Sequence, residues 1–225
     1  MIHLQQVSFG YDGREILSAV QAEIAAGSFH FLTGPSGAGK TTLLKLLYLE
    51  ALPQGGKLSL FGEDPVAAGS DARMQLRRRI GIVFQDFRLL DHLSVAENVT
   101  LPLIVHGRDP AKNAGDVADL IRWVGLSHRA DAPPRALSAG EKQRAAIARA
   151  VITSPDLIIA DEPTGNVDAE MGMRILRLLV ELNRLGKTVL IATHDLGLIR
   201  SARSLVTARI LRLADGRLTA GGAEL

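Results

Sequence analysis

The sequence predicts an α/β fold with a mainly parallel core sheet, an antiparallel β edge and an inserted α-helical subdomain. Several short apolar runs are each followed by small or polar residues and then by a helical pattern, which is typical of parallel strands covered by helices. Residues 2–9 and 16–24 instead flank a turn and predict an antiparallel pair. A long helical stretch separates the early strands from the late ones. We therefore expect one domain over residues 1–225, with the helical subdomain inserted at about residues 86–155.

The composition fits a folded protein of a reducing compartment. The chain has 225 residues, of which 47% are hydrophobic, so it can bury a sizeable core. Lysine and arginine (26) narrowly outnumber aspartate and glutamate (24), so the charge gives no reason to expect a nucleic-acid partner. The absence of cysteine excludes disulfides and thiolate metal sites. The sequence shows neither a signal peptide nor an apolar run of membrane-spanning length, so we expect any action at a membrane to need another chain.

A glycine-rich loop between a strand and a helix predicts the function most directly. Residues 29–33 form an apolar run, residues 42–49 have a helical pattern, and the sequence between them matches G-x-x-x-x-G-K-[ST]. The backbone N–H groups of such a loop can surround a polyphosphate, Lys40 can reach the β and γ phosphates, and Thr41 can hold Mg²⁺. A glycine-rich turn without a ligand is the alternative, but the flanking elements favour nucleoside triphosphate binding. The expected phosphate contacts are Gly34, Pro35, Ser36, Gly37, Ala38, Gly39, Lys40, Thr41 and Thr42.

Two single side chains stand where ligands often bind. Tyr11 lies at the turn of residues 10–13, where adenine could stack on its ring, although a plain aromatic at a sheet edge explains it equally well. Gln85 follows the buried strand predicted at residues 80–84. A glutamine at a strand end is usually structural, but the carboxyl ends of parallel strands provide the ligand contacts in open α/β sheets. Gln85 could therefore reach Mg²⁺ or an attacking water.

The helical subdomain contains a clear helix start. Ser94 is a predicted N-cap with Glu97 three residues later, and helical patterns follow over residues 98–106 and 111–124. We expect the small core of this subdomain to contain Leu120, Ile121, Trp123 and Val124.

A second turn of small residues opens a later helix. Ser138, Ala139 and Gly140 precede a helical pattern that we expect to extend to about Thr153. Small residues at a helix N-terminus form an anion site. Because one nucleotide pocket already has its phosphate loop, this second turn makes most sense if it completes a site on another copy of the protein.

Two later strands end in groups suited to phosphate hydrolysis. The apolar run that begins at Leu157 ends in Asp161, which can bind the Mg²⁺ held by Thr41, and Glu162, which can polarise a water for in-line attack on the γ-phosphate. The strand predicted at residues 188–193 ends at His194. We expect His194 to donate a hydrogen bond to the γ-phosphate, with a purely structural histidine as the alternative.

The remaining segments complete the predicted fold. Residues 169–184 have the pattern of an amphipathic helix, and residues 209–218 form a closing hairpin. A loose tail is expected from Gly221 onward.

Together these motifs resemble the ATPase cassette of ABC proteins along essentially the whole chain. The matching motifs are the aromatic loop (Tyr11), Walker A (34–41), the Q-loop (Gln85), the signature (137–143), Walker B (157–162), the D-loop (166–168) and the switch loop (His194). The resemblance implies hydrolysis of ATP to ADP and phosphate with Mg²⁺, and a head-to-tail homodimer that encloses two ATP molecules. The implied catalytic residues are Lys40, Gln85, Glu162 and His194, the metal-binding residues are Thr41, Gln85 and Asp161, and the contacts across the dimer are Ser138, Gly140 and Asp168.

Within the ABC family, four longer stretches resemble the FtsE-type ATPases of cell division: residues 29–47, 83–90, 160–166 and 182–199. This resemblance implies an FtsX-like integral membrane partner that relays ATP-driven motion to regulators of cell-wall hydrolases. It also implies a peripheral position at the cytoplasmic face of the inner membrane, at the division site. ATPases of lipoprotein release and macrolide export have a similar architecture and stay as an alternative, as does a nucleotide-gated division scaffold with slow turnover.

The signature departs from the usual Leu-Ser-Gly-Gly-Gln at two positions. Ala139 replaces the first glycine and Glu141 replaces the glutamine. A Cβ at position 139 is tolerable if φ is negative there, although it could loosen the approach to a γ-phosphate. We therefore expect the contacts across the dimer to come from Ser138 and Gly140 rather than from Ala139.

Overall fold

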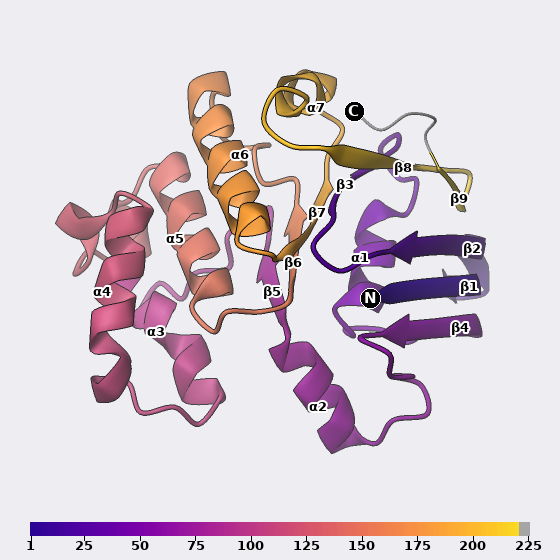
Figure 1. The fold of residues 1–225 in the computed structure, drawn as a ribbon, viewed down its shortest axis with the longest axis horizontal. Helices are drawn as coiled ribbons and strands as arrows, with labels where there is room; N and C mark the ends of the chain where they lie inside the picture. The colour runs from indigo at the N-terminus through magenta and orange to yellow at the C-terminus, as the bar shows by residue number, and fades with distance from the viewer. Residues whose placement is uncertain (221–225) are drawn as a thin grey trace.

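The structure, a computed structural model, describes residues 1–220, which form two sheets with helices packed between and around them (Figure 1). The strands are β1 (Ile2–Tyr11), β2 (Arg14–Ile24), β3 (Phe29–Thr33), β4 (Gly55–Leu60), β5 (Ile80–Val83), β6 (Leu157–Asp161), β7 (Thr188–Ala192), β8 (Ala208–Ala214) and β9 (Arg217–Ala220). The α-helices are α1 (Lys40–Leu47), α2 (Ser70–Arg78), α3 (Val95–Val105), α4 (Ala114–Trp123), α5 (Ala139–Val151), α6 (Ala169–Arg184) and α7 (Leu196–Ala202). Short 3-10 turns cover Ala111–Asn113, Ser127–Arg129 and Pro134–Ala136.

The two sheets differ in strand direction, as predicted. The larger sheet has the order β5-β6-β7-β3-β8-β9, and its neighbours are parallel except for the antiparallel pair of β8 and β9. The smaller sheet has the order β2-β1-β4 and is antiparallel throughout. This arrangement confirms the predicted α/β class. Because β3, β5, β6 and β7 run in the same direction, the residues that follow them gather at one edge of the sheet.

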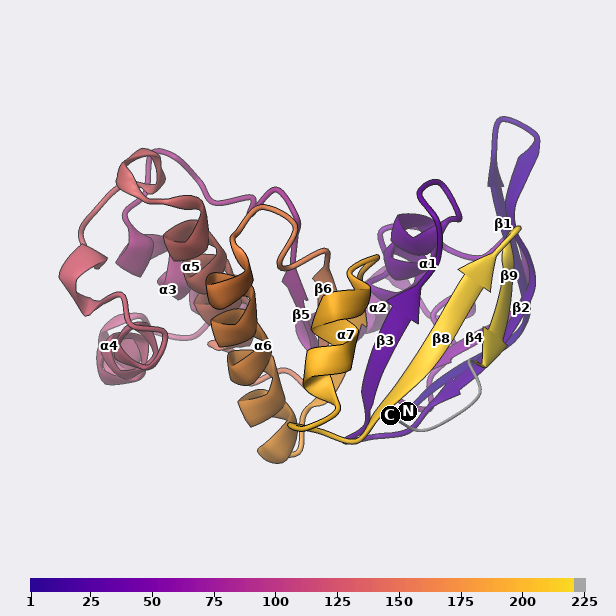
Figure 2. The same ribbon diagram turned by 90° about the horizontal axis from the view of Figure 1, so that it is seen from above.

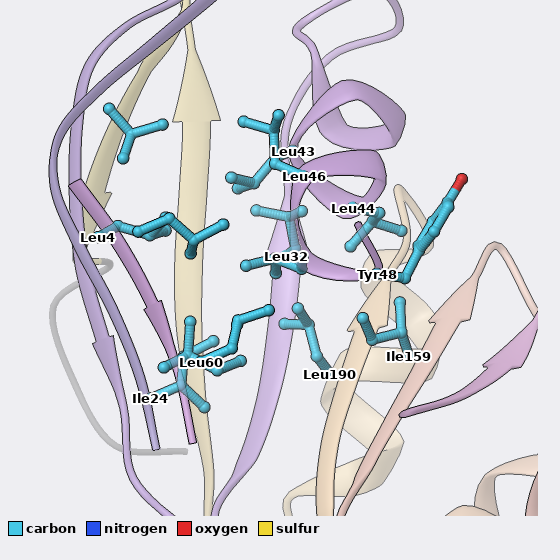
Figure 3. Packing of buried hydrophobic residues seen from close by; sticks show 14 of the residues in the cluster. Leu4, Ile24, Leu32, Leu43, Leu44, Leu46, Tyr48, Leu60, Ile159 and Leu190 are labelled. Carbon is cyan, nitrogen blue, oxygen red and sulfur yellow. The ribbon is translucent and has the colours of Figure 1, made fainter. Parts of the chain in front are cut away.

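Helix α1 lies between the two sheets. Its side chains Leu43, Leu44 and Leu46 belong to one buried cluster with Leu4 of the smaller sheet and Leu32 of the larger sheet (Figure 3). All five are at most 3% exposed. The glycine-rich loop that leads into α1 is therefore held by a helix that contacts both sheets.

The opposite face of the larger sheet is covered by α6 and α7 (Figures 1 and 2). Successive residues of a strand point to opposite faces, so Ile159 packs with α1 while its neighbour Ile158 packs in the second cluster. Helix α5 contributes Ile147 and Val151 to this second cluster. The larger sheet is thus buried on both faces around β5, β6 and β7, which explains why these three strands are mainly apolar runs.

A third cluster joins α3, α4 and α5 at one end of the molecule (Figure 1). Its buried side chains include Val99 of α3, Ile121 of α4 and Ala148 of α5. This cluster lies within the range predicted as a helical subdomain. Since α5 takes part in both the second and the third clusters, it connects the helical region to the sheet.

Some local expectations differ from the structure. Trp123 is 37% exposed and takes no part in the third cluster, whereas Ile121 and Val124 are at most 3% exposed; the indole is too far round α4 to face α3 and α5. Helix α7 was not predicted from the sequence, because its 7 residues are too few to show a clear helical periodicity. The expected tail from Gly221 lies outside the described residues. No helix within residues 1–220 is both long and apolar enough to cross a membrane.

A buried histidine on β3 makes the stability of this fold depend on pH. His30 is 1% exposed, and its Nδ1 lies 3.2 Å from Ser28 Oγ. Burial, with a smaller contribution from the Arg209 guanidinium, lowers the pKa of His30 from 6.5 to about 4. Between these two values the unfolded chain binds a proton that the folded chain does not bind, so the folded state loses stability as the pH falls.

We predict that His30→Gln removes this part of the pH dependence. Between pH 6.5 and about pH 4, the free energy of unfolding of the parent should decrease with falling pH more steeply than that of the variant, by at most about 1.4 kcal/mol per pH unit. Urea denaturation at several pH values measures both slopes. His92→Gln, at an exposed histidine, is the control and should keep the parent slope. Parallel curves for the parent and His30→Gln would contradict a neutral buried His30.

Candidate active site

An open cavity of about 520 Å³ lies where the carboxyl ends of β3, β5, β6 and β7 face the β1–β2 hairpin. It is lined by Tyr11, Ile16, Ser36, Gly37, Gly39, Lys40, Thr41, Thr42, Gln85, Asp161, Glu162 and His194. All of these except Ile16 are predicted site residues. Ile16 was missed because an apolar residue in a strand carries no sign of ligand contact. Groups from five separate parts of the chain therefore converge on one cavity.

The glycine-rich loop has a backbone that only small residues fit well. Gly37 and Gly39 have φ values of 78° and 99°, in the left-handed region that favours glycine. A Cβ on Gly34 would lie 2.1 Å from the carbonyl oxygen of Leu213 in β8. Gly39 also precedes the first residue of α1, so the helix N-terminus opens onto the cavity. Backbone N–H groups and the helix dipole thus favour an anion here.

Lys40 is held close to this loop. Its Nζ donates to the carbonyl oxygens of Gly34 and Pro35, at 2.9 and 3.1 Å. Gly34, Pro35 and Ala38 do not line the main cavity; Pro35 and Ala38 line a neighbouring one. The ammonium group is nevertheless within the cavity lining, where it can exchange its carbonyl partners for phosphate oxygens.

Thr41 and Asp161 meet although 120 residues separate them in the sequence. The Thr41 hydroxyl donates to Asp161 Oδ2 at 3.1 Å. Burial raises the pKa of Asp161, and the hydrogen bond from Thr41 acts against this shift. Within residues 1–220 no group of three His, Asp or Glu side chains could hold a metal by itself. A cation here would therefore need hydroxyl and amide oxygens as well as the carboxylate, a donor set that suits Mg²⁺.

Glu162 is constrained in several ways beside Asp161. Its backbone φ is 45°, a strained value for a residue with a Cβ. His194 Nδ1 donates to Glu162 Oε1 at 2.8 Å, and the two side chains are 72% and 11% exposed. The other carboxylate oxygen, Oε2, is buried and has no hydrogen-bond partner among residues 1–220. Glu162 therefore lines the cavity with one carboxylate oxygen whose capacity to accept a hydrogen bond is unused.

The cavity rim contains Tyr11 and Gln85. The Tyr11 ring is 44% exposed and packs edge-on against Phe9, with the ring centroids 5.0 Å apart. The hairpin beneath it is fixed by Gln54, whose amide group hydrogen-bonds to both the N–H and the carbonyl of Gly10. Sequence reasoning missed Gln54 because the contact joins residues 44 positions apart. Gln85 lines the cavity from the loop after β5.

The predicted residues of the second turn lie outside this cavity. Ser138 is the N-cap of α5, and Gly140 is buried against Met171, where a Cβ would lie 2.8 Å from Met171 Cγ. Asp168 caps α6 by accepting a hydrogen bond from the N–H of Met171 at 2.8 Å. These three residues therefore do not line the cavity of their own chain.

The structure accommodates both differences from the usual signature, Ala139 and Glu141, through contacts near this turn. Ala139 lies in the first turn of α5 with a negative φ, so its Cβ is accommodated. Glu141 completes a capping box, since its carboxylate accepts a hydrogen bond from the N–H of Ser138 at 2.8 Å. It also pairs with Arg129 at 3.2 Å. The backbone hydrogen bond is the main cause that lowers the pKa of Glu141 to about 2. The extra negative charge of Glu141 is thus neutralised locally.

Comparison with known proteins gives a consistent result. The sequence pattern of the ABC transporter family matches residues 17–165. The cell division ATP-binding protein FtsE of Escherichia coli (strain K12) is 45% identical over 222 residues, which cover 98% of each chain. The lipoprotein-releasing system ATP-binding protein LolD 1 of Rhodopirellula baltica is 43% identical over 185 residues, 81% of each chain. The dimeric ATP-binding cassette MJ0796 in a post-hydrolysis state with ADP and Pi superimposes with a TM-score of 0.86 and 34% identity, covering 97% of this chain and 96% of that one.

Family and fold thus agree, and the family predicted from the motifs is confirmed. The chain belongs to the ABC transporter family and is an ATP-binding, ATP-hydrolysing subunit of that family.

Proposed function

We propose that this ATPase is the motor subunit of an FtsE–FtsX-like complex, in which closure of an ATP-bound dimer drives a membrane partner that controls cell-wall hydrolysis during division. The observation that carries the proposal is the similarity to FtsE over nearly the whole chain. The partner would be an FtsX-like integral membrane protein. The ATPase would lie at the cytoplasmic face of the inner membrane, at the division site, and reach the membrane only through that partner.

ATP would bind with its adenine and its phosphates at opposite ends of the cavity. Adenine would stack on the exposed ring of Tyr11 at the rim, while the phosphates lie against the N–H groups of residues 37–42 at the start of α1. Lys40 would exchange its two carbonyl partners for oxygens of the β and γ phosphates. The γ-phosphate would then face Glu162 and His194.

Mg²⁺ would be held by Thr41, Gln85 and Asp161. The fit is supported by the 3.1 Å contact of Thr41 Oγ1 with Asp161 Oδ2 and by the position of Gln85 in the same cavity lining. These are the hard oxygen donors that Mg²⁺ prefers. Bound there, the ion would neutralise negative charge on the β and γ phosphates.

Glu162 is the proposed general base. An attacking water would donate a hydrogen bond to the Glu162 carboxylate, whose Oε2 has no partner among residues 1–220 and whose Oε1 is held by His194. The proton of this water moves to Glu162 as the water oxygen bonds to the γ-phosphorus and the bond to the β-phosphate oxygen breaks. The exposed imidazole of His194 would stabilise charge on the γ-phosphate oxygens.

A second copy would complete the site. Ser138, Gly140 and Asp168 do not line the cavity of their own chain, and in a head-to-tail homodimer they would contact ATP bound to the partner copy. Hydrolysis removes the γ-phosphate that joins the copies, so the dimer opens and the motion passes to the membrane protein.

A lipoprotein-release or macrolide-export ATPase is the second candidate. The 43% identity to LolD 1 favours this candidate. The same catalytic groups would serve both functions, so they do not separate the two candidates. The identity of the membrane partner would distinguish the two, as would the groove residues after Gln85 (Phe87, Leu89, Leu90 and Leu93).

Glu162→Gln is predicted to lower kcat by about 10²- to 10⁴-fold, because the amide cannot take the proton of the attacking water. ATP binding should persist, so the variant should form an ATP-dependent dimer on size-exclusion chromatography. Glu170→Gln, at a surface carboxylate paired with Arg174, is the control and should hydrolyse ATP normally. Parent-like turnover by Glu162→Gln would show that another group is the base.

Lys40→Ala is predicted to weaken ATP binding at least about tenfold, because a charge-assisted hydrogen bond to phosphate is lost. Titration with a fluorescent ATP analogue measures the dissociation constant. Lys57→Ala, at an exposed lysine of β4, should bind like the parent. Unchanged affinity in Lys40→Ala would refute the phosphate-binding role of the loop.

The division role is tested by capture of the membrane partner. Tagged Glu162→Gln protein with ATP and Mg²⁺ should retain the partner from detergent-solubilised native membranes, whereas Lys40→Ala should not. Recovery of an FtsX-like protein supports the proposal. Recovery of a lipoprotein-releasing or export permease would keep the catalytic assignments and replace the biological one.

A further inference from the structure

The loop that follows Gln85 has an unusual backbone. Phe87 and Arg88 are consecutive residues with φ values of 60° and 47°, in the left-handed region where a Cβ is unfavourable. Neither residue is glycine, so the surrounding structure must impose this conformation. Gln85, two positions earlier, lines the cavity beside Asp161 and Glu162.

Both ends of this loop are fixed by asparagine side chains. Asn166 Nδ2 donates to the carbonyl oxygen of Gln85 at 2.8 Å. Asn98 of α3 is completely buried, and its amide group bonds to both the N–H and the carbonyl of Leu90. The segment between these anchors is the part that contains Phe87 and Arg88.

Arg149 of α5 holds the middle of the loop. Its Nη1 donates to the carbonyl oxygen of Arg88 and its Nη2 to that of Phe87, the latter at 2.7 Å. The guanidinium is partly buried, and burial lowers the pKa of Arg149. It therefore bridges the carbonyls of the two left-handed residues with two parallel donors, a geometry that a planar guanidinium provides and an ammonium group does not.

We propose that Arg149 is a positioning residue of the ATPase reaction, which holds the loop of residues 85–90 in its left-handed conformation and so presents the Gln85 side chain to the cavity. The proposal rests on the proposed role of Gln85. Arg149 lies in the last turn of α5, whose N-cap is Ser138 and whose first turn contains Gly140. One helix would thus connect the loop of its own site to the groups offered to the partner copy.

Arg149→Met removes both donors while keeping a long apolar side chain. The expected result is a kcat about ten- to hundredfold below that of the parent, because Gln85 is displaced. The Kd for ATP should change less than about twofold, since Tyr11 and the phosphate loop are untouched. Arg149→Lys should fall between the parent and Arg149→Met, because one ammonium group cannot bridge both carbonyls in the same way.

A glycine in the loop separates this role from a general loss of packing. Arg88→Gly in the Arg149→Met background removes the Cβ that disfavours left-handed φ, and should recover most of the lost kcat. Arg88→Ala in the same background is the matched control, since it removes the same contacts of Arg88 with Asp86 and Phe84 but keeps the Cβ. It should not recover activity. If Arg149→Met does not fold, the same two substitutions are compared in Arg149→Lys.

Parent-like kcat in Arg149→Met, or equal activity of the Gly and Ala double variants, would overturn the proposal. Gln85→Ala and Glu162→Gln are measured in parallel. Normal turnover in either would refute the proposed catalytic assignment itself. If both are impaired and Arg149→Met is not, only the role of Arg149 fails.

Discussion

The enclosure of α1 between the two sheets is the constraint on which the site depends. The position of the helix is fixed, because its leucines pack against the antiparallel sheet on one side and the parallel sheet on the other. Its first residue is Lys40, and the loop that precedes it has glycines at the left-handed positions. The packing of α1 against both sheets therefore fixes the direction in which the N–H groups of the loop point.

The parallel strands of the larger sheet bring the site residues together. Each strand delivers the residues at its carboxyl end to the same edge, so Thr41, Gln85, Asp161 and His194 meet although they are scattered through the sequence. The contact between Thr41 and Asp161 and that between Glu162 and His194 follow from the pairing of β6 with β7 and of β7 with β3. The reacting groups occupy one small region, but their relative positions depend on the pairing of strands across the larger sheet.

The packing of α1 and the convergence of the parallel strands explain which features could be predicted from the sequence. The strands and most helices follow from apolar runs and capping residues, so β3 and α6 occur at the predicted residues. The lining of the cavity follows from motif positions, and only Ile16 was missed. Hydrogen bonds between distant side chains and backbone, such as those of Gln54 with Gly10 and of Arg149 with the loop after β5, could not be predicted. They depend on the register and packing of elements whose sequences carry no local trace of the contact.

The position of β3 in the larger sheet has a consequence for how the protein is made. Its neighbours on either side are β7 and β8, with Phe29 paired to Val189 and to Ala208, and Gly34 packs against Leu213. A ribosome makes the phosphate-binding strand well before either of these partners. Until β7 and β8 have been made, this strand and its glycine-rich loop have neither of their neighbours in the larger sheet, so the nucleotide site can form only after both strands have left the ribosome.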